Sequence, residues 1–98
     1  MISLCHSDLY VFLYIYPKEV SENDLTSLCE NLKKDTSRGI KFKFKFNSLY
    51  LFTYDAIGGK ITITENSEVV KQIKIDFPKF TFFIDNSGSK GVELSLFA

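Results

Sequence analysis

Residues 39–55 read GIKFKFKFNSLYLFTYD, in which lysine and phenylalanine alternate three times before a second run of aliphatic and aromatic residues. Alternation of polar and apolar residues is the pattern of a β-strand with one buried and one exposed face. We therefore expect strands over 40–46 and 49–54, separated by a turn at Asn47 and Ser48. The pairing of these two strands decides which aromatic side chains share a face with the lysines.

A two-residue turn would make the two segments a hairpin with Phe46 opposite Leu49. In that register one face carries the apolar side chains Ile40, Phe42, Phe44, Phe46, Leu49 and Leu51. The other face carries cations and rings, a mixture suited to stacking bases or to cation–π contacts with a protein: Lys41, Lys43, Lys45, Tyr50, Phe52 and Tyr54. A three-residue loop would instead direct Tyr50, Phe52 and Tyr54 into the core.

A simpler interpretation is that Lys41, Lys43 and Lys45 are the solvated face of a half-buried strand. Lysines also protect an edge strand from pairing with other chains. The sequence leaves the functional and the structural interpretation of the three lysines open.

An amphipathic helix is predicted directly before this stretch. Ser21 can act as its N-cap by accepting a hydrogen bond from the amide of Asp24, and Gly39 is a candidate terminator. The apolar stripe of the helix follows the i, i+3, i+4, i+7 spacing through Leu25, Leu28, Cys29 and Leu32.

A strand over 9–16 precedes the helix and alternates aliphatic with aromatic residues. Both of its faces are therefore apolar, which is typical of a central strand. Further strands are expected at 60–64, 69–77, 80–84 and 92–97, separated by Gly58-Gly59, ENSE, Pro78 and NSGSKG.

These elements predict an α+β fold with one amphipathic helix packed on a twisted, mainly antiparallel sheet of six to seven strands. The spacing of apolar residues in 66–73 also fits a second helix, which would make the fold ferredoxin-like βαββαβ. A chain of 98 residues has apolar side chains for one core, so we expect a single domain over 1–98. One helix covers only part of one face of such a sheet, so the aromatic face must curl onto itself or meet a partner.

The composition indicates an ordinary folded chain, 45% hydrophobic and 24% charged, with no net charge. Its longest apolar run, 9–16, is shorter than a membrane span, and no positively charged segment precedes it, so we expect no membrane association. Cys5, Cys29 and His6 lack the spacing of a metal site, and without an export signal the two cysteines are expected to be reduced thiols in the cytoplasm. We expect no cofactor.

No nucleophile and base stand in a recognisable catalytic arrangement, so we expect a binding protein rather than an enzyme. A small inhibitor, such as an immunity protein that neutralises a bacterial toxin by direct binding, fits a short chain without catalytic groups. A toxin that is a nuclease, being basic, would meet an acidic patch of Glu19, Glu22, Asp24 and Glu30. An acidic partner would meet the lysines. Two alternatives remain: a nucleic-acid-binding module, which zero net charge disfavours, and a homo-oligomeric structural subunit.

Overall fold

The computed structural model describes residues 2–34, 38–75, 81–85 and 91–97, with one α-helix, a short 3-10 helix and two sheets among them. The elements follow one another as β1 (Ile2–His6), β2 (Tyr10–Ile15), the short 3-10 helix η1 (Pro17–Glu19), α1 (Glu22–Lys34), β3 (Gly39–Lys45), β4 (Tyr50–Asp55), β5 (Lys60–Glu65), β6 (Glu68–Lys74), β7 (Thr81–Asp85) and β8 (Gly91–Phe97).

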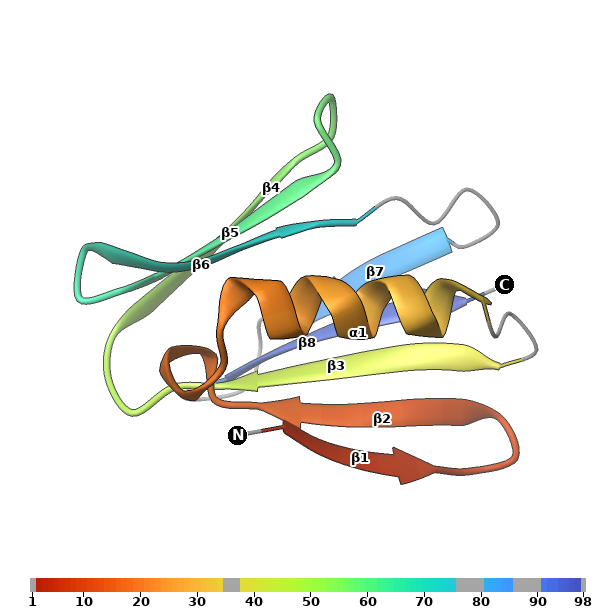
Figure 1. The fold of residues 1–98 in the computed structure, drawn as a ribbon. Coiled ribbons are helices and arrows are strands. Elements are labelled where there is room, and N and C mark those ends of the chain that lie inside the picture. Colours follow the sequence, from red (N-terminus) through yellow and green to blue (C-terminus); the bar gives the residue numbers. More distant parts are fainter. Residues whose placement is uncertain (1, 35–37, 76–80, 86–90, 98) are drawn as a thin grey trace.

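The fold is α+β, as the sequence predicts, with two sheets that contain eight strands between them. The larger sheet has the order β1-β2-β3-β8-β7, and only its β2–β3 pair is parallel. Helix α1 makes the crossover that a parallel pair requires. The smaller sheet is the antiparallel meander β4-β5-β6. In Figure 1, α1 lies across one face of the larger sheet and the smaller sheet rises beside the helix.

The helix begins as the sequence predicts, because Ser21 satisfies one of its free N-terminal amides. Ser21 Oγ accepts a hydrogen bond of 3.1 Å from the amide of Asp24, and Ser21 O accepts the first helical bond, from Leu25. Leu25 and Cys29 are buried against the sheets. Gly39, expected to end the helix, is instead the first residue of β3.

Ser21→Ala should lower the free energy of unfolding by about 1 kcal/mol, because the amide of Asp24 loses its acceptor. Ser27→Ala is a matched control, since Ser27 is exposed within the same helix and alanine is a better helix former. Thermal or urea unfolding measures both variants. Equal stability of the two variants would show that Ser21 does not stabilise the start of the helix.

Two hairpin turns in the smaller sheet contain residues with positive φ. Asn66 and Ser67 have φ values of 54° and 65°, which is the pattern of a type I′ turn between β5 and β6. Gly59 has φ 63° between β4 and β5, where Asp55 Oδ1 accepts the amides of Ile57 and Gly58 at 3.0 and 3.3 Å. Both turns were predicted from the sequence.

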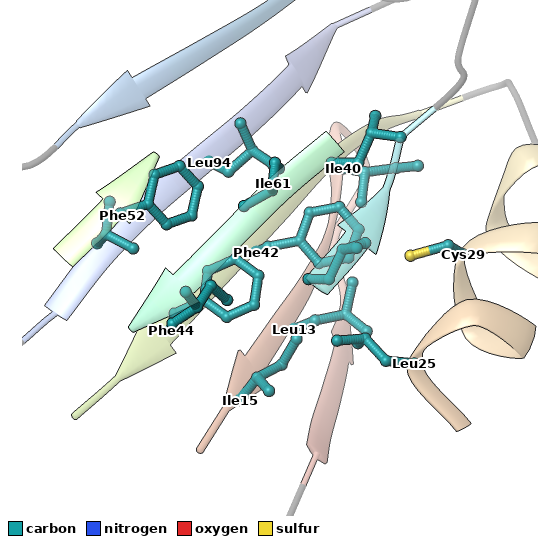
Figure 2. Packing of buried hydrophobic residues seen from close by; sticks show 14 of the residues in the cluster. Leu13, Ile15, Leu25, Cys29, Ile40, Phe42, Phe44, Phe52, Ile61 and Leu94 are labelled. Carbon is teal, nitrogen blue, oxygen red and sulfur yellow. The ribbon is translucent and has the colours of Figure 1, made fainter. Parts of the chain in front are cut away.

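The core lies between the helix-side face of the larger sheet and the inner face of the smaller one. Fully buried side chains from β2, β3 and β8 meet Ile61 and Ile63 of β5 and Leu25 of α1. Figure 2 shows this packing around Phe42 and Phe44, whose rings stack with centroids 6.2 Å apart. Phe44 also contacts Phe52 of the smaller sheet at 5.9 Å, so its ring joins the two sheets.

Three expectations are corrected by the strand pairing. The expected hairpin of 40–46 with 49–54 is wrong, because β3 pairs with β2 and β8 whereas β4 pairs with β5. The alternative second helix over 66–73 is wrong, since Glu68–Lys74 is a strand with a bulge opposite Ile63 and Thr64. The strands form two sheets rather than one, and β1 is an additional strand that the sequence pattern did not indicate.

The smaller sheet explains how the core is covered although the described residues contain only one α-helix. The three strands of the smaller sheet, together with α1, cover one face of the larger sheet. Within the described residues, no helix is long and apolar enough to span a membrane.

Candidate functional site

The outer face of the larger sheet, opposite α1, carries rows of rings and lysines. Tyr10, Phe12 and Tyr14 point away from the core because the alternate residues of β2 are buried, and the parallel register places them beside Gly39, Lys41 and Lys43. Glu93 follows on β8, directly opposite Lys43. We call this surface the lysine–aromatic face: Tyr10, Phe12, Tyr14, Lys41, Lys43, Lys45 and Glu93.

The lysine ammonium groups of this face lie over the aromatic rings of the neighbouring strand. Lys41 Nζ is 4.5 Å from the ring centroid of Tyr10 and 5.7 Å from that of Phe12. Lys43 and Lys45 lie 5.7 and 5.3 Å from the ring of Tyr14. Cation–π contacts of this kind hold the side chains in a defined layer without removing them from solvent.

Gly39 makes room for one end of the layer. A Cβ at this position would lie 2.7 Å from Cδ1 of Tyr10, closer than real contacts allow. The ring of Tyr10 therefore packs directly against the backbone of β3. Tyr10 also meets Phe12 edge-on, with centroids 5.7 Å apart.

Glu93 connects two of the lysines across the strands. Its carboxylate oxygens lie 3.6 Å from Lys41 Nζ and 3.5 Å from Lys43 Nζ, and Ser95 Oγ donates to Glu93 Oε1 at 3.2 Å. All of these groups are partly exposed except Ser95, which is buried beneath its neighbours. The face thus carries three cations and one bridging carboxylate, together with three half-buried rings.

The strands at the margins extend this face. Phe83 of β7 is 60% exposed and lies beside Ser95, and Asp85 lies beside Glu93. On the opposite margin, Cys5 of β1 lies beside Phe12.

The lysines predicted as site residues lie on this face, but the aromatic residues predicted to accompany them do not. Tyr50, Phe52 and Tyr54 face the core side of the smaller sheet, as the alternative three-residue loop would have directed them. Tyr50 donates a 2.6 Å hydrogen bond to the carbonyl of Gly91 and stacks on Phe46 at 4.2 Å. The rings that accompany the lysines come from β2, and Glu93 was not identified from the sequence.

The predicted acidic residues lie on the other side of the larger sheet. Glu19 is exposed on η1, and Glu22, Asp24 and Glu30 are exposed on α1. At about 100° per residue, the three helical carboxylates fan out around the solvent side of the helix rather than forming one row. A partner that covers the lysine–aromatic face therefore does not cover these carboxylates at the same time.

A buried carboxylate, Glu65, holds the connection between the two sheets. Its side chain is 7% exposed, lies 3.3 Å from Lys18 Nζ, and accepts hydrogen bonds from Ser48 Oγ at 3.1 Å and the Asn47 amide at 3.3 Å. Burial raises the pKa of the Glu65 carboxyl, but the hydrogen bonds from Lys18, Ser48 and Asn47 outweigh burial and lower the pKa below its ordinary value. No local pattern in the sequence indicates this role, since the partners lie at least 17 positions away.

The two thiols differ in environment. Cys29 is buried in the core, and this burial, aided by the charge of Glu30, raises its pKa to about 11, so the thiol stays protonated. Cys5 is exposed on β1. Among the residues that the structure describes, no three His, Cys, Asp or Glu side chains gather closely enough to hold a metal ion.

Comparison with protein-family models, with curated proteins and with solved structures gives no match for this chain.

Proposed function

We propose that this chain is a non-catalytic binding protein that acts as a small inhibitor, in the manner of an immunity protein that neutralises a toxin by direct binding. The lysine–aromatic face is its contact surface, and the partner is a protein with an acidic contact surface. The observation that carries the proposal is the ordered layer of rings and lysines on a sheet face that neither α1 nor the smaller sheet covers.

The rings supply the anchors that such an interface needs. Interface energy concentrates in a few central aromatic and cationic side chains surrounded by a polar rim. Phe12 lies at the middle of β2, flanked by Tyr10 and Tyr14, and the lysines hold the layer in place before binding. With the marginal strands β1 and β7 included, the outer face of the five-stranded sheet spans roughly 20 Å in each direction, which is room for the centre of an interface of standard size.

The charge of the face supports a partner with an acidic contact surface. Glu93 bridges Lys41 and Lys43, whereas Lys45 is exposed and lies beyond this bridge, over the ring of Tyr14. The excess of lysine attracts carboxylates on the partner and speeds association. The helical carboxylates are left facing solvent on the other side of the sheet, so they add little to this contact.

The test uses the partner isolated from the source cell with the wild-type chain as bait, then purified and titrated against variants. Phe12→Ala should weaken binding about 30-fold or more, the loss of a central anchor. Leu51→Ala is the matched control, because Leu51 is exposed on the smaller sheet and its loss should leave the affinity unchanged. Melting curves of both variants establish that they are folded.

Charge variants separate the two predicted surfaces. Replacing Lys41, Lys43 and Lys45 together by Gln should slow association and weaken binding by about one to three decades. The corresponding neutralisation of Glu19, Glu22, Asp24 and Glu30 should change affinity by less than about threefold. The complex should also block the partner's own activity at a one-to-one ratio. Loss of binding only in the carboxylate variant, or binding without inhibition, would overturn the proposal.

A second candidate function is binding of single-stranded nucleic acid, because sheet faces with lysines and rings can hold a backbone and stack bases. Two of the three lysines are already paired with Glu93, so few counterions would be released on binding. A labelled oligonucleotide should therefore bind no more tightly than about 10 µM at 150 mM salt, as measured by fluorescence anisotropy. Submicromolar binding with a steep salt dependence would favour this function over the inhibitor.

A further inference from the structure

Strand β1 is an edge of the larger sheet without the usual protection against pairing with another strand. Natural edge strands carry charges, prolines or bulges, or are covered by another element. β1 reads ISLCH, with no proline and no Asp, Glu, Lys or Arg, and its pairing with β2 runs without a bulge. Four of its five residues are exposed, among them Leu4 at 49%.

The other edges described by the structure differ from β1. α1 and η1 lie against β6. β4 carries Asp55 at its end, and β7 carries Asp85. Among the edges that the structure describes, β1 alone is both uncovered by any other described element and without an acidic or basic side chain apart from His6.

The hydrogen bonds of the β1–β2 hairpin show which backbone groups of β1 point outward. The amide of Ser7 donates to the carbonyl of Tyr10 at 2.8 Å, so residues 7 and 10 form a hydrogen-bonded pair. Such pairs alternate along an antiparallel ladder. Ser3 and Cys5 therefore bond to β2, whereas the backbone groups of Ile2, Leu4 and His6 are directed away from it.

We propose that β1 pairs antiparallel with β1 of a second copy of this chain, about a two-fold axis at Leu4. Under this symmetry, the outward backbone groups of Leu4 pair with those of Leu4 in the second copy, and those of Ile2 pair with those of His6. The pairs together form about six backbone hydrogen bonds. The two exposed Leu4 side chains cover each other on the helix side of the sheet. Ser3 and Cys5 of opposite copies face each other on the other side.

The axis runs perpendicular to the sheet, so the two larger sheets join into one and both lysine–aromatic faces lie on the same side of it. The pairing leaves those faces uncovered, and the inference holds whatever they bind. An extended segment of another protein could use the same edge, but the uncharged and self-matching strand favours a second copy.

The first test measures the mass of the protein by sedimentation at about 100 µM, since an interface this small is expected to be weak. The wild type should be a dimer, and Leu4→Lys should weaken self-association about tenfold or more by placing like charges opposite each other. Leu51→Lys is the matched control, because it makes the same change at an exposed leucine of the smaller sheet, on its edge strand β4. A monomeric wild type, or a dimer lost in Leu51→Lys and retained in Leu4→Lys, would overturn the proposal.

A covalent test reports the register. Ser3→Cys should place an introduced thiol opposite Cys5 of the second copy at the close approach of a non-hydrogen-bonded pair, within reach of a disulfide. Mild oxidation should then give a disulfide-linked dimer, with peptide mapping assigning the bond to positions 3 and 5 of different copies. The wild type, with serine at position 3, should not form this link. Cross-links that instead join equivalent positions, or none at concentrations where the wild type is dimeric, would contradict the register.

Discussion

Phe44→Ala should lower the free energy of unfolding by about 3–5 kcal/mol, the cost of removing a fully buried aromatic ring. Phe44 is 1% exposed and contacts Phe42 in its own sheet and Phe52 in the other. Its loss leaves a cavity where the two sheets meet, and the backbones on both sides are held by their own hydrogen bonds. Collapse around the cavity is therefore limited.

Lys45→Ala is the control for this experiment, since the two positions lie next to each other on β3 and point to opposite faces of the sheet. Its effect on stability should stay within about 0.5 kcal/mol. Urea unfolding of both variants at pH 7 makes the comparison. Similar losses of stability in the two variants would mean that the buried and open faces of β3 have been assigned incorrectly.

Glu65→Gln should lower the free energy of unfolding by about 2 kcal/mol at neutral pH, because hydrogen bonds to a buried charged group contribute roughly 1.5–3 kcal/mol. Ser48 and Asn47 both donate to Oε1, so the amide oxygen of Gln can still accept from both, but the amide loses the negative charge of these bonds and the ion pair of Oε2 with Lys18. Lys18 is 55% exposed, so Lys18→Ala should cost less than the change at Glu65.

The stability difference between the wild type and Glu65→Gln should depend on pH. The pKa of Glu65 is lower in the folded than in the unfolded chain, since burial is outweighed by the bonds from Lys18, Ser48 and Asn47. The contribution of the carboxylate is complete above the unfolded pKa, about 4.3, and is lost as the pH falls through the lower, folded value. Unfolding curves from pH 7 into this acid range should therefore converge for the two proteins. A constant difference would show that the charge of Glu65 is not what stabilises the connection.

The elements that depend on local chemistry were predictable from the sequence. The helix follows from Ser21 and the spacing of Leu25 and Cys29, and the break between β5 and β6 follows from the ENSE segment around Asn66. The alternation of lysine with phenylalanine identified β3 and its buried face. In each case the signal and the structure involve residues within one turn or one strand.

Strand pairing was not predictable to the same degree, because it depends on contacts between distant residues. Asn47 and Ser48 resemble a hairpin turn, but they contact Glu65 and carry the chain into a second sheet. β1 escaped detection because an exposed edge strand needs no alternation of polar and apolar residues.

The candidate site was predicted in part for the same reason. The sequence indicated the lysines, and it also indicated that the aromatic residues of β2 need a cover. It did not indicate the parallel pairing of β2 with β3, which brings the lysines and the rings of β2 together. Glu93 joins them from β8, about 50 residues later in the chain.

Binding at the lysine–aromatic face is tested most directly by titrating the isotope-labelled protein with its purified partner and following the NMR shifts of the backbone amides. We expect the largest shifts at residues 10–14, 41–45 and 93–95, on the three central strands of the lysine–aromatic face. The amides of α1 should shift little, because the helix lies on the other side of the sheet. Shifts concentrated on Glu22–Lys34, with the three strands unaffected, would contradict the claim that the open sheet face is the binding surface.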